Sequence, residues 1–114
     1  MRYAWTGEKF EASEVVALET RHMKEILVAD IDGDGKQELY AAIEAEIGGR
    51  GKIKQPVEIR RFDWKDGKFE ATTVTEIADR LCRFLVAGDI DGDGKNELIA
   101  AAFSAGVWVI EHDG

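Results

Sequence analysis

The heptapeptide Asp-Ile-Asp-Gly-Asp-Gly-Lys occurs twice in this chain, at Asp30–Lys36 and at Asp89–Lys95, and a glutamate stands two positions after each copy. Three aspartates at alternate positions concentrate negative charge, which disfavours folding unless a cation neutralises it. Calcium suits such a set of hard oxygen ligands because it takes six to eight of them. The glycines permit the positive φ angles that wrap a short loop around an ion. The pattern therefore predicts two calcium sites.

The two loops belong to a longer internal repeat with an offset of 59 residues. The alignment needs no gap from Arg2, which matches Arg61, through Ala42, which matches Ala101. Within it, Trp5 matches Trp64, and the tetrapeptide Lys-Phe-Glu-Ala at 9–12 recurs at 68–71. The repeat unit is therefore the first unit of structure to consider.

Composition limits the classes of protein to which this chain can belong. Its 114 residues suffice for one domain, and 45% are hydrophobic, yet no run approaches the ~20 apolar residues of a membrane span. The first nine residues contain no apolar run of the signal-peptide kind. The net charge is −8, without a basic stripe, so we expect neither a nucleic-acid nor a membrane partner. Cys82 is the only cysteine, which excludes an intrachain disulfide.

Short apolar runs flank each loop and favour an all-β fold. Continuous runs at 24–29 and 83–88 precede the loops and are typical of strands buried on both faces. Asp66-Gly67 is a hairpin signal between two β-rich segments. We therefore expect antiparallel strands at 24–29, 38–46, 57–64 and 68–76, and again at 83–88, 97–103 and 107–111. By repeat equivalence, residues 2–5 and 9–18 resemble the last two strands of a further unit.

At this level the chain resembles the FG-GAP/VCBS-type repeat, the blade of integrin-α-like β-propellers. The resemblance rests on an apolar strand, the loop Asp-x-Asp-x-Asp-Gly-x-x-acid and a following Leu-led strand. The Phe-Gly and Gly-Ala-Pro elements of the family are absent, and Glu38 and Glu97 replace the more usual aspartate, which points to the broader VCBS-like branch. The resemblance implies blades of four antiparallel strands. One complete blade at 24–77 would lie between partial blades at 1–20 and 82–114.

The resemblance also implies the ligands of two structural Ca²⁺ ions per chain. In each loop three aspartates and one glutamate would bind through side chains and one lysine through its backbone carbonyl. These residues are Asp30, Asp32, Asp34, Lys36 and Glu38 in the first loop, and Asp89, Asp91, Asp93, Lys95 and Glu97 in the second. Alternate positions of a tight loop do converge on one point, so the chemistry agrees with this assignment.

An EF-hand or dockerin-like helical calcium module is the competing interpretation, since its loop also begins Asp-x-Asp-x-Asp-Gly. The second half of the loop argues against it, because the twelfth position, where EF-hands place a bidentate glutamate, is Ala41 or Ala100. No Ser/His/Asp arrangement or phosphate loop has a persuasive context, so we do not expect an enzyme, although the chain could be a non-catalytic part of a larger one.

The expected role is a calcium-dependent scaffold for protein or glycan binding, and the resemblance suggests an extracellular or cell-surface setting. Two blade-equivalents cannot close a ring that usually has four to eight. We therefore expect a homo-oligomer, or further blades in a longer chain, and favour three copies over four. The segment Gly48–Pro56 occurs only in the first unit, and we expect a solvated loop at the end of the blade opposite the calcium.

Overall fold

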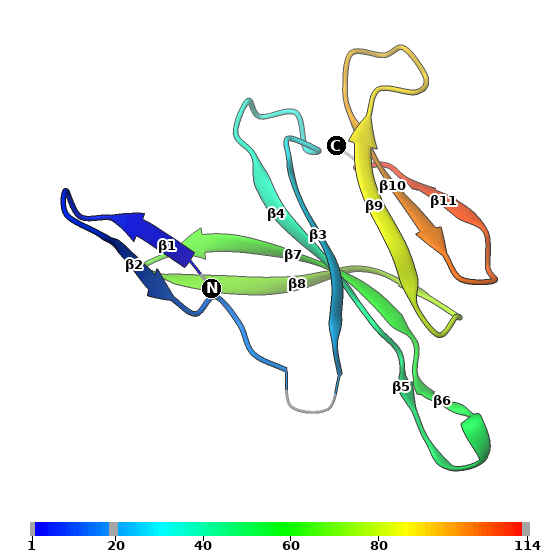
Figure 1. The fold of residues 1–114 in the computed structure, drawn as a ribbon. Helices are drawn as coiled ribbons and strands as arrows, with labels where there is room; N and C mark the ends of the chain where they lie inside the picture. Colours follow the sequence, from blue (N-terminus) through cyan, green and yellow to red (C-terminus); the bar gives the residue numbers. More distant parts are fainter. Residues whose placement is uncertain (1, 19–20, 113–114) are drawn as a thin grey trace.

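The computed structural model describes residues 2–18 and 21–112, which form antiparallel sheets (Figure 1). Within these residues there is no α-helix, and so none that could cross a membrane; the one helical element is the three-residue 3₁₀ turn η1 (Gly49–Gly51). The all-β prediction is confirmed. The EF-hand or dockerin-like alternative is wrong for the described residues, because strands and not helices flank both acidic loops.

Two sheets make up most of the molecule. The first sheet is a meander of β3 (Met23–Ala29), β4 (Glu38–Ile43), β7 (Val57–Lys65) and β8 (Lys68–Ile77), in that order. The second sheet contains β9 (Cys82–Gly88), β10 (Glu97–Ala102) and β11 (Val107–Ile110), also in chain order. A shift of 59 residues carries the bounds of β3 and β4 onto those of β9 and β10, so the sequence repeat is a structural repeat.

A separate hairpin of β1 (Arg2–Trp5) and β2 (Phe10–Ser13) precedes the first sheet. Its register repeats that of β7 and β8, since Trp5 pairs with Phe10 as Trp64 pairs with Phe69. The predicted strand at 9–18 is therefore present only in its first part, because the structure assigns no strand to residues 14–18.

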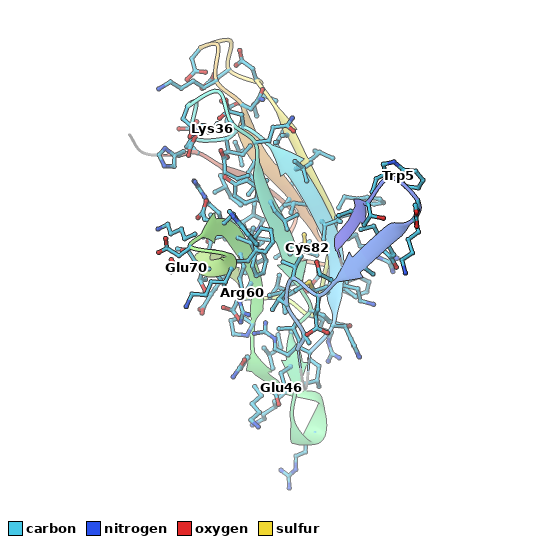
Figure 2. The ribbon with its side chains drawn as sticks, turned by 90° about the vertical axis from the view of Figure 1, so that its left-hand side faces the viewer. Trp5, Lys36, Glu46, Arg60, Glu70 and Cys82 are labelled. Atoms are coloured by element: carbon cyan, nitrogen blue, oxygen red, sulfur yellow. The ribbon has the colours of Figure 1, made fainter. Side chains whose placement is uncertain are left out.

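The insertion unique to the first unit is a small hairpin rather than a loop. It consists of β5 (Glu46–Ile47) and β6 (Ile53–Gln55) joined through η1. It lies at the end of the molecule opposite the acidic loops, as expected, with Glu46 and Lys36 toward opposite ends (Figure 2). The strand expected at 38–46 ends at Ile43, because the next two amides donate outside the sheet, Glu44 to the His22 carbonyl and Ala45 to the Arg80 carbonyl.

The hydrophobic core lies between the two sheets, where β3 and β4 contact β9. Side chains alternate between the faces of a strand, so each sheet contributes every second residue. The first sheet contributes Tyr40, Ala42 and Ile59, and the second contributes Leu85, Leu98 and Ala100. Full burial of one such large aliphatic side chain stabilises the fold by about 1.5–3 kcal/mol. This packing holds the two acidic loops at the same end of the molecule (Figure 1).

Asp79, in the turn between β8 and β9, is a buried acid that holds the β10–β11 turn at one end of the second sheet. Its carboxylate accepts hydrogen bonds from the amides of Arg80 (2.7 Å), Ser104 (2.6 Å) and Ala105 (2.7 Å), and from the Ser104 hydroxyl (3.1 Å). Burial raises the pKa of Asp79, but these four donors outweigh it and hold the pKa below its usual value. Sequence reasoning missed this residue, because its partners Ser104 and Ala105 lie 25 and 26 residues away in the chain.

Candidate metal centres

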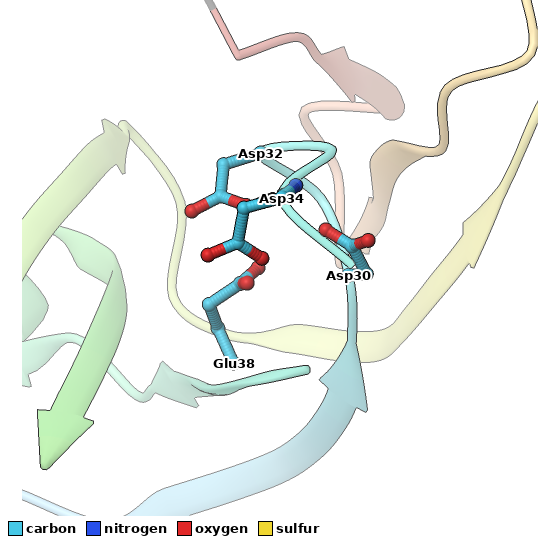
Figure 3. Close-up of side chains that lie close together, drawn as sticks. All are labelled: Asp30, Asp32, Asp34 and Glu38. Carbon is cyan, nitrogen blue, oxygen red and sulfur yellow. Dashed lines mark hydrogen bonds between the residues drawn. The ribbon is translucent and has the colours of Figure 1, made fainter. Parts of the chain in front are cut away.

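The first acidic loop joins β3 to β4 and folds around its own aspartates (Figure 3). Asp30 accepts hydrogen bonds from the amides of Gly33 and Gly35, both at 2.8 Å. Those two glycines have φ angles of 78° and 85°, a region that strains other residues. The amide of Asp34 donates to Asp32 (3.1 Å), and that of Lys36 donates to Asp34 (2.7 Å). The backbone thus turns the carboxylates inward.

The second loop, between β9 and β10, repeats this network bond for bond. Asp89 accepts from the amides of Gly92 and Gly94 at 2.8 Å each. Asp91 accepts from the Asp93 amide (3.1 Å), and Asp93 accepts from the Lys95 amide (2.8 Å). Identical heptapeptides therefore give identical local geometry, even though the two loops occupy different places in the fold.

Four carboxylates converge in each loop, from Asp30, Asp32, Asp34 and Glu38 in the first and from Asp89, Asp91, Asp93 and Glu97 in the second. One oxygen from each lies within 4.8 Å of the others. Two oxygens that bind one calcium ion at about 2.4 Å can be at most about 4.8 Å apart, so the spacing fits a shared ion. Within the described residues, these are the two groups of three or more His, Cys, Asp or Glu able to hold a metal.

The structure thus brings together every acidic residue of the predicted ligand sets. It places Lys36 and Lys95 on the same loops through their amide hydrogen bonds, while their carbonyls as ligands stay a prediction.

Glu38 gives a second, independent indication of a cation. It is only 6% exposed, and its Oε2 accepts hydrogen bonds from the Ile31 amide (2.9 Å) and the Tyr40 hydroxyl (3.1 Å). Its Oε1 is buried, and among the described residues it has no hydrogen-bond donor. Burial of an unpaired carboxylate oxygen is costly, and a metal ion removes that cost. The residues therefore fit a hard divalent cation.

The surroundings of the two loops differ in charge. The Nη2 of Arg61, from β7, lies 3.1 Å from the Oδ2 of Asp32. Burial raises the pKa of Asp32, but the Asp34 amide and the Arg61 guanidinium outweigh it and hold the pKa below its usual value. In the second loop the Asp93 amide lowers the pKa of Asp91, but desolvation and the charges of Asp93 and Glu97 together raise it above its usual value.

The two loops also touch each other. The side-chain amide of Asn96 donates to the carbonyl of Asp30 at 3.4 Å. Ile31 of the first loop is 5% exposed and lines a small cavity with Leu98 and Ile110, whereas its equivalent Ile90 is 58% exposed. Ile31 therefore anchors the first loop between the sheets, although residues 33–37 of that loop are exposed, whereas the second loop lies at the surface.

The family model described as FG-GAP-like repeat matches residues 30–100, more than half of the chain, with the first acidic loop at its start and the second inside it. No curated protein and no solved structure matches. The match agrees with the motif, the loop geometry and the strand repeat: the chain belongs to the family of FG-GAP-like repeats.

Proposed function

We propose that this chain is a calcium-binding β-propeller module in which each acidic loop holds one structural Ca²⁺ ion. The observation that carries the proposal is the pair of matching carboxylate clusters, one of which contains the buried, unpartnered Oε1 of Glu38. The side-chain ligands would be the aspartates at the first, third and fifth positions of each loop and the glutamate at its ninth position. The backbone carbonyls of Lys36 and Lys95 would complete the protein ligands, and water would fill the remaining places.

The four-strand meander of the first sheet supports its assignment as one complete propeller blade. The three strands of the second sheet correspond to the first three strands of a blade. The β1–β2 hairpin corresponds to the last two, because it has the register of β7 and β8. For these three units we keep the predicted boundaries of 1–20, 24–77 and 82–114, of which residues 1, 19–20 and 113–114 lie outside the described part of the chain.

Each ion would neutralise clustered charge and so couple metal binding to folding. Because Glu38 and Glu97 are buried within the carboxylate clusters, we assign the acidic residues a structural and not a catalytic role. The module would then serve as a calcium-stabilised scaffold for protein or glycan binding. Trp5 and Trp64 are equivalent in the repeat and both more than half exposed, and we assign them to packing between blades rather than to a sugar-binding surface.

Isothermal titration calorimetry of the chain with Ca²⁺ tests the proposal. We expect two sites with dissociation constants on the order of 10⁻⁴–10⁻³ M, the range of extracellular modules. The double variant Asp34→Asn/Asp93→Asn should lose binding at both sites. Asp66→Asn, the same change in the exposed β7–β8 turn, should bind as the wild type does. An absence of calcium heat, together with loop NMR signals that do not respond to Ca²⁺, would refute the proposal.

A further inference from the structure

The two sheets of this chain pack through opposite faces. The face of the first sheet that contacts the second contains Leu27, Tyr40, Ala42 and Ile59, and is called the rear face here. It meets the face of the second sheet with Leu85, Leu98 and Ala100. By the 59-residue repeat, these three match Ile26, Leu39 and Ala41, which define the front face of the first sheet. The intramolecular contact is therefore rear face against front face.

The first sheet therefore keeps an apolar front face, and the second sheet keeps an apolar rear face. In each case the equivalent face of the other sheet is buried in the contact between the two sheets. Ile26 on the front face of the first sheet is 61% exposed, whereas its equivalent Leu85 is 3% exposed. On the rear face of the second sheet, Val86 is 49% exposed, although its equivalent Leu27 packs against the core. The other large apolar side chains exposed on that rear face are Phe84, Val107 and Val109. The front face is only partly covered within one copy: Ala41 is 1% exposed, but an apolar groove of about 430 Å³, lined partly by Val15 and Val16, is left on this face.

We propose that a second copy of this chain covers these surfaces, with the rear face of its second sheet packed against the front face of the first sheet here. The occupant follows from the chain itself, because the same two kinds of face already form its internal interface. A contact between two different surfaces is heterologous, so it propagates head to tail and closes when the rotation per chain divides the circle. Three copies would supply six sheets and four would supply eight, within the usual range of propellers.

Strand pairing supports the same placement independently. The registers with β4 and β10 make β11 equivalent to part of β7, with Val107 in the place of Ile59 and Trp108 in that of Arg60. In the first sheet, Ile59 pairs with Thr75 and Arg60 with Thr73 on β8. Among the described residues, however, β11 pairs only with β10.

The missing partner of β11 is present at the other end of the chain. Residues 14–18 correspond by the repeat to 73–77, the part of β8 that pairs with the equivalent of β11, and they form no strand within one copy. They lie beside the front face, since Val15 and Val16 line its groove. A neighbouring sheet packed on that face would bring β11 to this segment, with Val107 of one copy opposite Val16 of the next. One placement thus satisfies both the open face and the open edge.

Light scattering of single and mixed variants tests the head-to-tail contact. Wild-type protein in Ca²⁺ at tens of micromolar should have a mass several times the 12.7 kDa of one chain. Val28→Glu on the front face and Val86→Glu on the rear face should each give monomers, because each abolishes every copy of the contact. An equimolar mixture should form a dimer and grow no further, since one intact surface of each kind remains. Ile53→Glu, an exposed position on β6, is the matched control and should assemble as the wild type does.

Disulfide trapping tests the proposed register without relying on the charged variants. Cysteines at directly opposed strand positions are within bridging distance. Val16→Cys/Val107→Cys should therefore form interchain disulfides on oxidation, whereas Val16→Cys/Ile53→Cys should not. The buried Cys82 does not compete. A folded wild-type monomer at these concentrations would overturn the proposal and leave the neighbouring units to a longer polypeptide. A variant mixture that stays monomeric, or a cysteine pair that never links copies, would also overturn it.

Discussion

The two acidic loops share a heptapeptide and a hydrogen-bond network but differ in almost everything around them. In the first loop, Arg61 pairs with Asp32 and the hydroxyl of Tyr40 donates to Glu38. In the second, register equivalence puts Val109 in the place of Arg61, and the repeat puts Ile99 in that of Tyr40. The comparison shows that the local sequence determines how the carboxylates converge, whereas neighbouring strands determine which side chains surround them.

Arg61 makes the two loops electrostatically unequal. Its guanidinium already supplies positive charge to Asp32, and an incoming ion must share that carboxylate with it. The second loop has its acids mostly exposed and its Asp91 pKa raised by its neighbours' charges, so it has more uncompensated negative charge. We therefore expect the second loop to bind calcium more tightly and the first to be the better ordered loop without metal.

The largest expected effect is the loss of one site when its buried glutamate is neutralised. Glu38→Gln and Glu97→Gln should each reduce the calcium stoichiometry from two to one, because each removes a charged ligand that the fold has already desolvated. The residual site of Glu38→Gln should be the tighter one. Calorimetry of both variants measures this, and Glu76→Gln, an exposed change on β8, is the control. Equal residual affinities would contradict the ranking of the loops.

Removal of calcium should lower the free energy of unfolding of the protein. An ion that binds only the folded loop stabilises it by RT ln(1 + [L]/Kd), which is about 1.4 kcal/mol per site at ten times Kd. For two sites we expect a melting temperature on the order of 10 °C higher in Ca²⁺ than in EDTA. Each glutamate variant should lose about half of this shift. A melting temperature that does not depend on calcium would show that neither loop couples metal binding to folding.

A further effect concerns Asp79, whose carboxylate holds the β10–β11 turn against the segment before β9. Asp79→Asn should cost about 1–3 kcal/mol, because an amide cannot accept all the hydrogen bonds that the carboxylate accepts. The folded-state pKa of Asp79 is lowered, so its contribution is present above the unfolded pKa of about 3.9 and is lost as pH falls through the folded value. Urea unfolding in EDTA from pH 7 to pH 3 measures this. The variant should lose less stability on acidification than the wild type, and parallel pH profiles would contradict the assignment.

The smallest expected effect concerns the guanidinium of Arg61, whose place beside the second loop is taken by Val109. Arg61→Gln should raise the calcium affinity of the first loop by about 1.5- to 5-fold, the worth of one partly exposed ion pair, and leave the second unchanged. Val109→Arg should lower the affinity of the second loop by a comparable factor. Arg60→Gln is the charge-matched control on the same strand, since Arg60 pairs with Glu58 and not with the loop. If Arg61→Gln and Arg60→Gln alter affinity equally, net charge alone accounts for the effect.

Much of the strand layout could be predicted because it depends on neighbouring residues. Apolar runs beside an Asp-Gly loop indicate strands, and the two copies of the repeat predict equivalent strands. The prediction was wrong where a segment's backbone partners lie elsewhere in the fold. The strand after the first loop ends early because the amides of Glu44 and Ala45 donate to other segments. The insertion forms a hairpin of its own, and residues 14–18 form no strand although the repeat aligns them with residues 73–77 of β8.

The sequence by itself determined the two carboxylate clusters, since every hydrogen bond that shapes them spans seven residues or fewer. Only the tertiary structure determined which residues of other segments contact each cluster. Arg61 reaches Asp32 because β7 lies beside β4, and Asn96 reaches the Asp30 carbonyl across 66 residues because the two sheets stack. Electrostatic contacts of this kind depend on distances of a few ångströms between remote segments. The two loops therefore share one heptapeptide but differ in the residues that surround them.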